Sequence, residues 1–187
     1  MGRGDNSSAG LIAGVDIETT GLYWNKNHRL IQIAVVFPGK DAYFSDVAPE
    51  GEVVVEPEAM QVNGLSLETV MKGPPQSKVD DLLCKFLQKI SSEAESIIPV
   101  GWNVGSFDLG FIQNELPRSA MFFSRRVIDL TSLGRFYELK TGKPYRELKT
   151  EMHAKAVSVL GRDERHNALY DAQAALIHLD MFKEMPF

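Results

Sequence analysis

Short β-type runs of apolar residues and helix-type repeats follow one another along the chain. Residues 11–17 form an apolar run that ends in a Thr-Gly turn signal, and residues 29–37 form a second run that ends at Pro38-Gly39. Such runs, bounded by turn residues, are typical of buried strands. The remaining predicted strands cover residues 41–47, 96–101 and 126–130.

Apolar residues at helical spacing predict the helices. In residues 77–90 they repeat every three or four positions, as on an amphipathic helix. Ser106 is the predicted cap of a helix that Pro117 ends, and Asn167 is the predicted cap of the last helix. Further helical segments cover residues 58–62, 67–71, 131–142 and 149–161. Three early strands, followed by alternating helices and strands, predict an α/β layered fold.

Two acids stand at the end of the first predicted strand. Side chains at i and i+2 of a strand share a face, so Asp16 and Glu18 converge on one side. Two close carboxylates repel each other, and Mg²⁺ or Mn²⁺ is the kind of ion that hard oxygen ligands prefer. The alternative interpretation is an ordinary strand exit with two solvated acids.

Two further segments contain candidate ligands. Asp108 lies in the first turn of a predicted helix, where the helix dipole alone also favours an acid. His166 precedes the cap Asn167, so it can turn toward Asp171, although a histidine beside a cap is often a surface residue. Small alanines around Asp171 allow this helix to lie close to the sheet. His28, His153 and His178 are interpreted as surface or helix-face residues.

Three ordered segments resemble the motifs of one enzyme family. "DIETTGL" (16–22), "GWNVGSFD" (101–108) and "HNALYDAQAAL" (166–176) resemble the exonuclease motifs of the DnaQ-like 3′–5′ exonucleases, the DEDDh class. "QVNGL" (61–65) is similar to the short segment that this family has between its first two motifs. The resemblance implies a ribonuclease H-like α/β fold, with a central mixed five-stranded sheet flanked by helices.

The resemblance also implies a role for each matching residue. Two divalent cations, Mg²⁺ or Mn²⁺, are expected, and His166 is expected to take a proton from the attacking water. The expected metal ligands are Asp16, Glu18, Asp108 and Asp171. The expected product is a nucleoside 5′-monophosphate released from a 3′ end. The expected substrate contacts are Thr19, Thr20, Gly21, Leu22, Asn103 and Phe107.

Charge is unevenly distributed, although the net charge of −5 is modest. Residues 118–165 carry 11 Lys and Arg against 6 Asp and Glu, whereas residues 1–117 carry 8 against 16. Such asymmetry points to a nucleic-acid partner. Seven cations cluster in this segment, and some of them are therefore expected to line the approach to the acids. They are Arg125, Arg126, Arg135, Lys140, Lys143, Arg146 and Lys149.

Length and composition bound the remaining expectations. Residues 1–10 are polar and rich in Gly and Ser, so a flexible tail is expected there, with a single exonuclease domain over residues 11–187. The tail lacks the apolar segment of a secretory signal, and the chain lacks a run of about 18 apolar residues that would cross a membrane. The single Cys84 fits a cytoplasmic or other reducing intracellular compartment.

Rival classes of function remain open from the sequence. One is a nucleic-acid-binding module that keeps the fold without hydrolysis, and another is an acidic metal-binding or scaffold domain. The complete set of four acids and His166 favours the enzyme. The expected partners are 3′ ends of single-stranded DNA or RNA, DNA slightly ahead, with a larger replication, repair or RNA-processing assembly as a candidate partner. Oligomeric state is not predicted.

Overall fold

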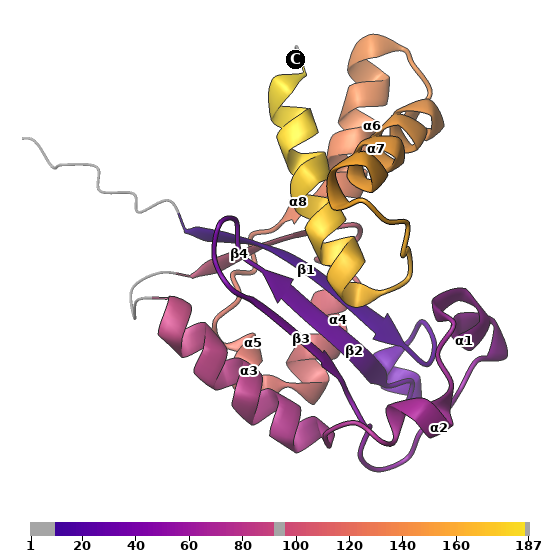
Figure 1. Ribbon diagram of the computed structural model, residues 1–187, viewed down its shortest axis with the longest axis vertical. Helices are drawn as coiled ribbons and strands as arrows, with labels where there is room; N and C mark the ends of the chain where they lie inside the picture. Colours follow the sequence, from indigo (N-terminus) through magenta and orange to yellow (C-terminus); the bar gives the residue numbers. More distant parts are fainter. Residues whose placement is uncertain (1–9, 92–95, 186–187) are drawn as a thin grey trace, which may run out of the picture.

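A five-stranded mixed sheet forms the centre of the protein (Figure 1). The computed structural model describes residues 10–91 and 96–185. Strand order is β3-β2-β1-β4-β5, with β1, β2 and β3 antiparallel to one another in turn and β4 parallel to both β1 and β5. The five strands are β1 (Leu11–Thr19), β2 (Leu30–Val36), β3 (Ala42–Asp46), β4 (Ile97–Gly101) and β5 (Ile128–Asp129). The predicted mixed five-stranded sheet is confirmed.

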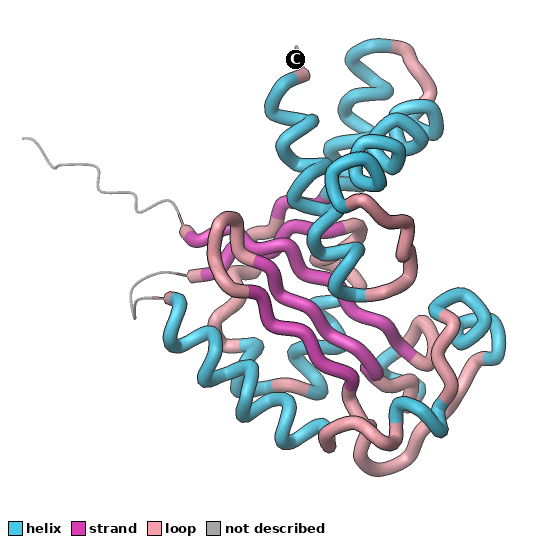
Figure 2. The backbone as a smooth tube through the Cα atoms, in the orientation of Figure 1, coloured by secondary structure: helices cyan, strands magenta, loops and turns pink. Residues whose placement is uncertain are grey.

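Helices cover both faces of the sheet (Figure 2). One layer contains α3, α4 and α5, the other contains α8 together with α6 and α7, and α1 and α2 lie near the end of β1 (Figure 1). The helices are α1 (Pro57–Asn63), α2 (Leu67–Val70), α3 (Gln76–Ile90), α4 (Asp108–Glu115), α5 (Pro117–Ala120), α6 (Leu130–Thr141), α7 (Tyr145–Leu160) and α8 (Ala168–Glu184).

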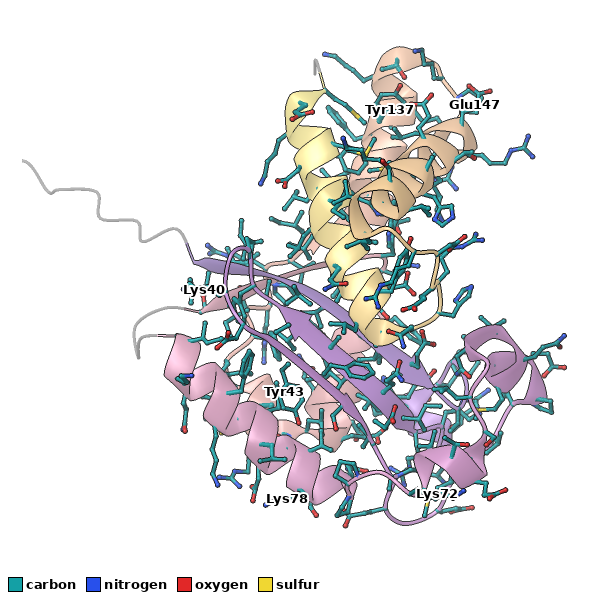
Figure 3. All side chains as sticks on the ribbon, in the orientation of Figure 1. Lys40, Tyr43, Lys72, Lys78, Tyr137 and Glu147 are labelled. Atoms are coloured by element: carbon teal, nitrogen blue, oxygen red, sulfur yellow. The ribbon has the colours of Figure 1, made fainter. Side chains whose placement is uncertain are left out.

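Alternate residues of β1 and β2 supply two cores. Ala13, Val15 and Ile17 are buried in the core shared with α3 and α4, whereas Ala34 of β2 packs with Ala172 of α8 on the opposite face. Side chains between α3 and the sheet include Tyr43 of β3 (Figure 3), whose ring lies 5.6 Å from that of Phe86. The face turned toward α8 is therefore the one that receives the even-numbered residues of β1.

Close approach of α8 to the sheet depends on Gly14. A Cβ atom at this position would lie 2.2 Å from the carbonyl oxygen of Ala172, a distance that no side chain tolerates. The expected close packing of the alanine-rich helix is therefore present, and it places the first turn of α8 over the end of β1.

Of the two predicted helix caps, one is present and one is not. Ser106 does not cap α4, because Phe107 precedes the helix and the Ser106 hydroxyl instead donates to the Asn103 carbonyl at 3.2 Å. Asn167 does cap α8, since its Oδ1 accepts the Tyr170 amide at 3.3 Å. The predicted tail falls on residues outside the described range, except Gly10. Within residues 10–91 and 96–185, no helix has the length and hydropathy that crossing a bilayer requires.

Candidate active site

Asp16 and Glu18 extend from β1 toward α8. Strand side chains alternate between faces, and Ala13, Val15 and Ile17 occupy the core on the α3 side. The two acids therefore share the opposite face, as the i, i+2 spacing predicts. Both are half-buried at the end of the strand.

A register shift follows the second acid. The pairing of β1 with β2 shifts between Glu18 and Thr19, and the amide of Leu30 beside it donates to Glu115 Oε1 at 3.1 Å. Such irregularities redirect a strand and are common beside active sites. Here the shift lies directly after Glu18, and β1 ends one residue later, at Thr19.

Asp108 comes to the same place from α4. It is the first residue of that helix and is only 3% exposed. Its Oδ1 accepts the backbone amide of Ile17 at 3.1 Å, so the carboxylate is fixed against β1 between Asp16 and Glu18. A sequence separation of 91 residues is bridged by this one contact.

Asp171 and His166 come from the start of α8. His166 lies in the preceding loop with φ +65°, and its amide donates to Asp171 Oδ2 at 2.7 Å. One ligand atom from each of Glu18, His166 and Asp171 can be chosen so that all three lie within 4.8 Å of one another. The predicted convergence of the loop histidine on Asp171 is therefore present in the structure.

Burial raises the pKa of all four acids, and neighbouring carboxylates add to the increase at Asp16, Glu18 and Asp108. Burial is the largest cause of the raised pKa of Asp16, followed by the charges of Asp108, Asp171 and Glu18. Burial, and then the charge of Asp171, raises the pKa of Glu18 to about 8. Burial likewise raises the pKa of Asp108 and of Asp171, although backbone hydrogen bonds oppose the increase. The cluster is therefore unfavourable in its ionised form unless a cation accompanies it.

The donor set fits a hard divalent cation. Asp16, Glu18, Asp108 and Asp171 offer carboxylate oxygens, which Mg²⁺ and Mn²⁺ prefer over softer ligands. A bound cation would also reverse the pKa shifts, because it stabilises the ionised carboxylates that burial disfavours. The four carboxylates therefore match the oxygen ligands that such an ion takes.

The turn after β1 is supported from below by a buried histidine. His28 is 3% exposed, its Nδ1 accepts the Tyr23 amide at 3.0 Å, and its Nε2 lies 3.5 Å from Glu56 Oε1. A Cβ at Gly21 would lie 2.5 Å from the ring, so only glycine fits over it. The interpretation of His28 as a surface or helix-face residue is wrong, because His28 lies in a loop and its ring is buried under the turn.

Thr19 and Thr20 are both buried in this turn. The Thr20 hydroxyl donates to the Val54 carbonyl and accepts the Arg29 amide, while its own amide donates to the Arg29 carbonyl. The Thr19 hydroxyl donates to the Gly21 carbonyl at 2.7 Å. Both threonine side chains therefore shape the turn, and Leu22, which is 59% exposed, is the side chain that it presents outward.

Two cavities flank the acids. The first, here called the turn pocket, has a volume of about 290 Å³ and lies between the end of β1, α1 and Phe107. Its wall is mainly apolar, and its charged residues are all acidic. The residues that define it are Glu18, Thr19, Leu22, Glu56, Glu58, Ala59, Val62, Asn63 and Phe107, with Ile17 at its base.

The second cavity, here called the α7–α8 pocket, has a volume of about 670 Å³. It joins Asp16, His166 and Asp171 to a wall of three cations. The cations are Arg146, Lys149 and Arg165. Trp102 also lines it, with the Lys149 Nζ 5.0 Å from the centre of the indole ring.

Some predicted residues take other places. Asn103 has a left-handed backbone with φ +58° and an exposed side chain, and it lines neither pocket. Among the seven predicted cations, only Arg146 and Lys149 line the α7–α8 pocket. Arg165 and His153, which also line it, were outside the predicted set. Their part in the pocket follows from the packing of α7 against α8, which spacing along the chain does not reveal.

Glu115 gives the site a titratable support. It is 2% exposed, its Oε2 has no hydrogen-bond partner among the described residues, and burial raises its pKa to about 7. The folded state then binds this proton more tightly than the unfolded chain, so the free energy of unfolding should fall as pH rises from about 4.5 through about 7.

We expect Glu115→Gln to remove that part of the pH dependence, because the amide oxygen still accepts the Leu30 amide but does not titrate. The free energy of unfolding, measured with urea, is compared for the variant and the wild type at each pH. The difference between them should shift in favour of the variant by about 2–3 kcal/mol from about pH 5 to about pH 8. Parallel pH curves for the two proteins would contradict the assignment.

Solved structures with a similar fold are nucleases. E. coli Exonuclease I in complex with a dT13 oligonucleotide matches with a TM-score of 0.67 and 15% identity, over 94% of this chain and 41% of that one. Cell-death related nuclease 4 (CRN-4) matches with a TM-score of 0.61 and 15% identity, over 92% and 63%. A 3′-exonuclease that recognises the histone mRNA stem-loop matches with a TM-score of 0.61 and 18% identity, over 95% and 65%.

These similarities show the fold, which is ribonuclease H-like, as the motif resemblance predicted. The chain spans about two fifths of the length of the E. coli Exonuclease I to which it is similar. No curated protein matches the chain in sequence.

A family model described as RNase_T, Exonuclease, matches residues 14–179. The matched region contains all four acids and His166, and it covers most of the chain. The three motifs, the mixed sheet and this match agree with one another, and the chain belongs to the RNase_T exonuclease family, which is DnaQ-like.

Proposed function

We propose that the chain is a metal-dependent 3′–5′ exonuclease that hydrolyses single-stranded nucleic acid and releases nucleoside 5′-monophosphates. The observation that carries the proposal is the convergence of Asp16, Glu18, Asp108, Asp171 and His166 between two pockets of different charge. We propose further that residues 11–187 form a single exonuclease domain and that it works in a reducing intracellular compartment.

The four acids would hold two divalent cations, Mg²⁺ or Mn²⁺. When bound, such ions lower the pKa of water and neutralise charge on the phosphate and on the leaving oxygen. The protein supplies a rigid set of carboxylates, since Asp108 is fixed by the Ile17 amide and Asp171 by the His166 amide. A site with this much negative charge repels a phosphodiester until cations compensate it.

His166 is proposed to accept the proton of the attacking water. Its side chain is exposed at the mouth of the α7–α8 pocket, and it can come close to Glu18 and Asp171. Histidine is the side chain that most often performs this task near neutral pH.

The charges of the two pockets fit digestion from the 3′ end, the direction that the motif resemblance implies. The part of the strand that remains after cleavage carries one phosphate per nucleotide and needs cations. Of the two pockets beside the acids, the α7–α8 pocket is the one that offers them. A terminal 3′ nucleoside has a neutral hydroxyl at its end and fits the turn pocket, where Leu22 and Phe107 provide apolar contact for a base. A strand that enters over Arg146 and Lys149 therefore places its 3′ terminus beside Glu18.

Both DNA and RNA remain candidate substrates, with DNA slightly favoured. One similar structure holds dT13 and another protein recognises the histone mRNA stem-loop. A partner assembly in replication, repair or RNA processing is proposed from the motif resemblance. The competing function is a catalytically silent nucleic-acid-binding module with the same fold.

A 5′-labelled single strand tests the proposed function. Purified protein is incubated with matched DNA and RNA oligonucleotides, with Mg²⁺, with Mn²⁺ and with a chelator. A ladder that shortens from the 3′ end only with metal supports the exonuclease, and its rate on DNA and RNA measures substrate preference. An oligonucleotide that is retarded in a gel but stays intact with either metal supports the silent module.

The cations of the α7–α8 pocket should control binding more than other cations of the same segment. Affinity falls as salt rises, so the slope of log affinity against log salt is negative. We expect Arg146→Gln/Lys149→Gln to make this slope less steep by about 1.4, which is about 0.7 for each lost phosphate contact. The measurement uses an Asp16→Asn background, so that the strand stays intact during titration.

The matched control is Lys140→Gln/Lys143→Gln, which removes the same charge outside this pocket. Its slope should stay close to that of the parent protein. Equal slopes for the two double variants would show that the effect is net charge and that the pocket is not the strand path.

A further inference from the structure

A row of three polar side chains crosses the sheet below α8. Glu18 of β1 pairs in register with Gln32 of β2, and Gln32 pairs with Asp46 of β3. Gln32 is 3% exposed, and every other residue of β2 is apolar and buried. A buried amide in such a strand is costly unless both of its polar ends are satisfied.

Gln32 satisfies both ends with partners far away in the sequence. Its Nε2 donates to Asp46 Oδ1 at 2.8 Å, and its Oε1 accepts the backbone amide of Ala168 at 2.9 Å. A peptide N–H can only donate and an ionised carboxylate can only accept, so these partners fix the orientation of the amide. Asp46 thereby holds the Gln32 oxygen toward α8.

The Ala168 amide belongs to the segment that carries the proposed base. Ala168 is the first residue of α8, and His166 stands two residues before it. Helix-start amides need partners outside the helix. Asn167 satisfies the Tyr170 amide and Asp171 satisfies the His166 amide, and Gln32 ties this segment to the sheet.

The backbone of His166 needs such restraint. Its φ of +65° is uncommon for a residue with a side chain, and a conformation of this kind persists when surrounding contacts impose it. Ala168 also packs on Ala34 of β2, but this apolar contact has no fixed direction. The other described hydrogen bonds of residues 166–168 come from the first turn of α8 itself, so the bond from Gln32 is the directional contact between this segment and the sheet.

We propose that Gln32 is a positioning residue that fixes His166 and the start of α8 above the acids, and that Asp46 acts through Gln32. This inference rests on the proposed function, because it assigns Gln32 to the reaction of that same site. Neither residue touches the substrate. Their effect is expected in the turnover number kcat, since alignment of the base matters in the transition state, and hardly in KM.

The first variant is Gln32→Met, which keeps the shape of the side chain and removes both hydrogen bonds. We expect kcat to fall roughly 10- to 100-fold, the scale on which residues that orient a site act, with KM changed less than threefold. Gln76→Met is the matched control, because Gln76 donates its Nε2 to the Glu115 carbonyl at 2.8 Å, away from α8. It should keep kcat.

Variants at Asp46 test the path through Gln32. Asp46→Asn keeps an acceptor oxygen and should behave almost like the wild type, whereas Asp46→Leu leaves the Gln32 amide unanchored and should lower kcat. The double variant Gln32→Met/Asp46→Leu should be no slower than Gln32→Met, because both changes break one chain of contacts. Should Gln32→Met fail to fold, the Asp46 pair still decides the question.

Hydrogen exchange of the Ala168 amide gives a readout that does not need activity. Its exchange should become faster in Gln32→Met and in Asp46→Leu, but not in Gln76→Met. An unchanged kcat in Gln32→Met, or a loss equal to that of Gln76→Met, would overturn the inference. If the wild type itself does not shorten the strand, the proposed function fails, and that result is distinct from any difference among the variants.

Discussion

Asp16→Asn is expected to abolish hydrolysis while the chain stays folded. The change keeps the volume of the side chain and removes the charge that lies between Asp108, Glu18 and Asp171. Because Asp16 is one of the four proposed metal ligands, its loss would weaken the binding of the cations on which the proposed reaction depends. The measurement is the rate of 3′ shortening of a 5′-labelled strand with saturating Mg²⁺ or Mn²⁺.

Stability of the same variant gives an independent readout. The pKa of Asp16 is raised in the folded protein, so ionisation of this group destabilises the fold above the pKa of the unfolded chain. Without metal at about pH 8, Asp16→Asn should therefore unfold at an equal or higher temperature than the wild type. Added Mn²⁺ should raise the midpoint of the wild type more than that of the variant, by mass action on the folded state.

Asp180→Asn serves as the control for this variant, because Asp180 is an exposed acid of α8 that pairs with Lys183. Its turnover and its response to Mn²⁺ should match those of the wild type. Wild-type-like turnover in Asp16→Asn would remove Asp16 from the metal site.

His166→Ala is expected to lower the rate roughly 10²- to 10⁴-fold, the usual scale for loss of a general base. Affinity for Mn²⁺, measured by calorimetry, should be retained, because the four carboxylates are the proposed ligands.

His153→Ala is the matched control for the base, since His153 lines the same pocket but lies 3.2 Å from Asp163. It should cost little activity. Because His166 can approach Glu18 and Asp171 closely, a role as ligand is the competing assignment. A loss of Mn²⁺ affinity in His166→Ala as severe as in Asp171→Asn would establish that competing role.

Much of the site could be predicted because its determinants are local. The spacing of Asp16 and Glu18 sets their common face, and the Asn167 cap sets His166 outside α8. The prediction of a cap at Ser106 failed for a local reason as well. The left-handed turn at Asn103 offers its carbonyl to the Ser106 hydroxyl, which then does not reach the amides of α4.

Other residues could not be assigned because their partners are distant in the sequence. Gln32 contacts Ala168 across 136 residues, and Glu115 contacts Leu30 across 85. The one signal in the sequence was Gln32 itself, a polar residue within the otherwise apolar strand β2. His28 gave no signal, because burial under Gly21 depends on how the loop folds back.

The contrast between the two pockets has a consequence for turnover. On the proposed direction, each cut leaves the nucleoside monophosphate in the turn pocket, whose charged side chains Glu18, Glu56 and Glu58 are all acidic, so only the proposed divalent cations would attract its doubly charged phosphate. The shortened strand keeps its own phosphates on Arg146, Lys149 and Arg165. Side chains of the protein thus hold the polymer and not the product, which favours many successive cuts for each encounter between protein and strand.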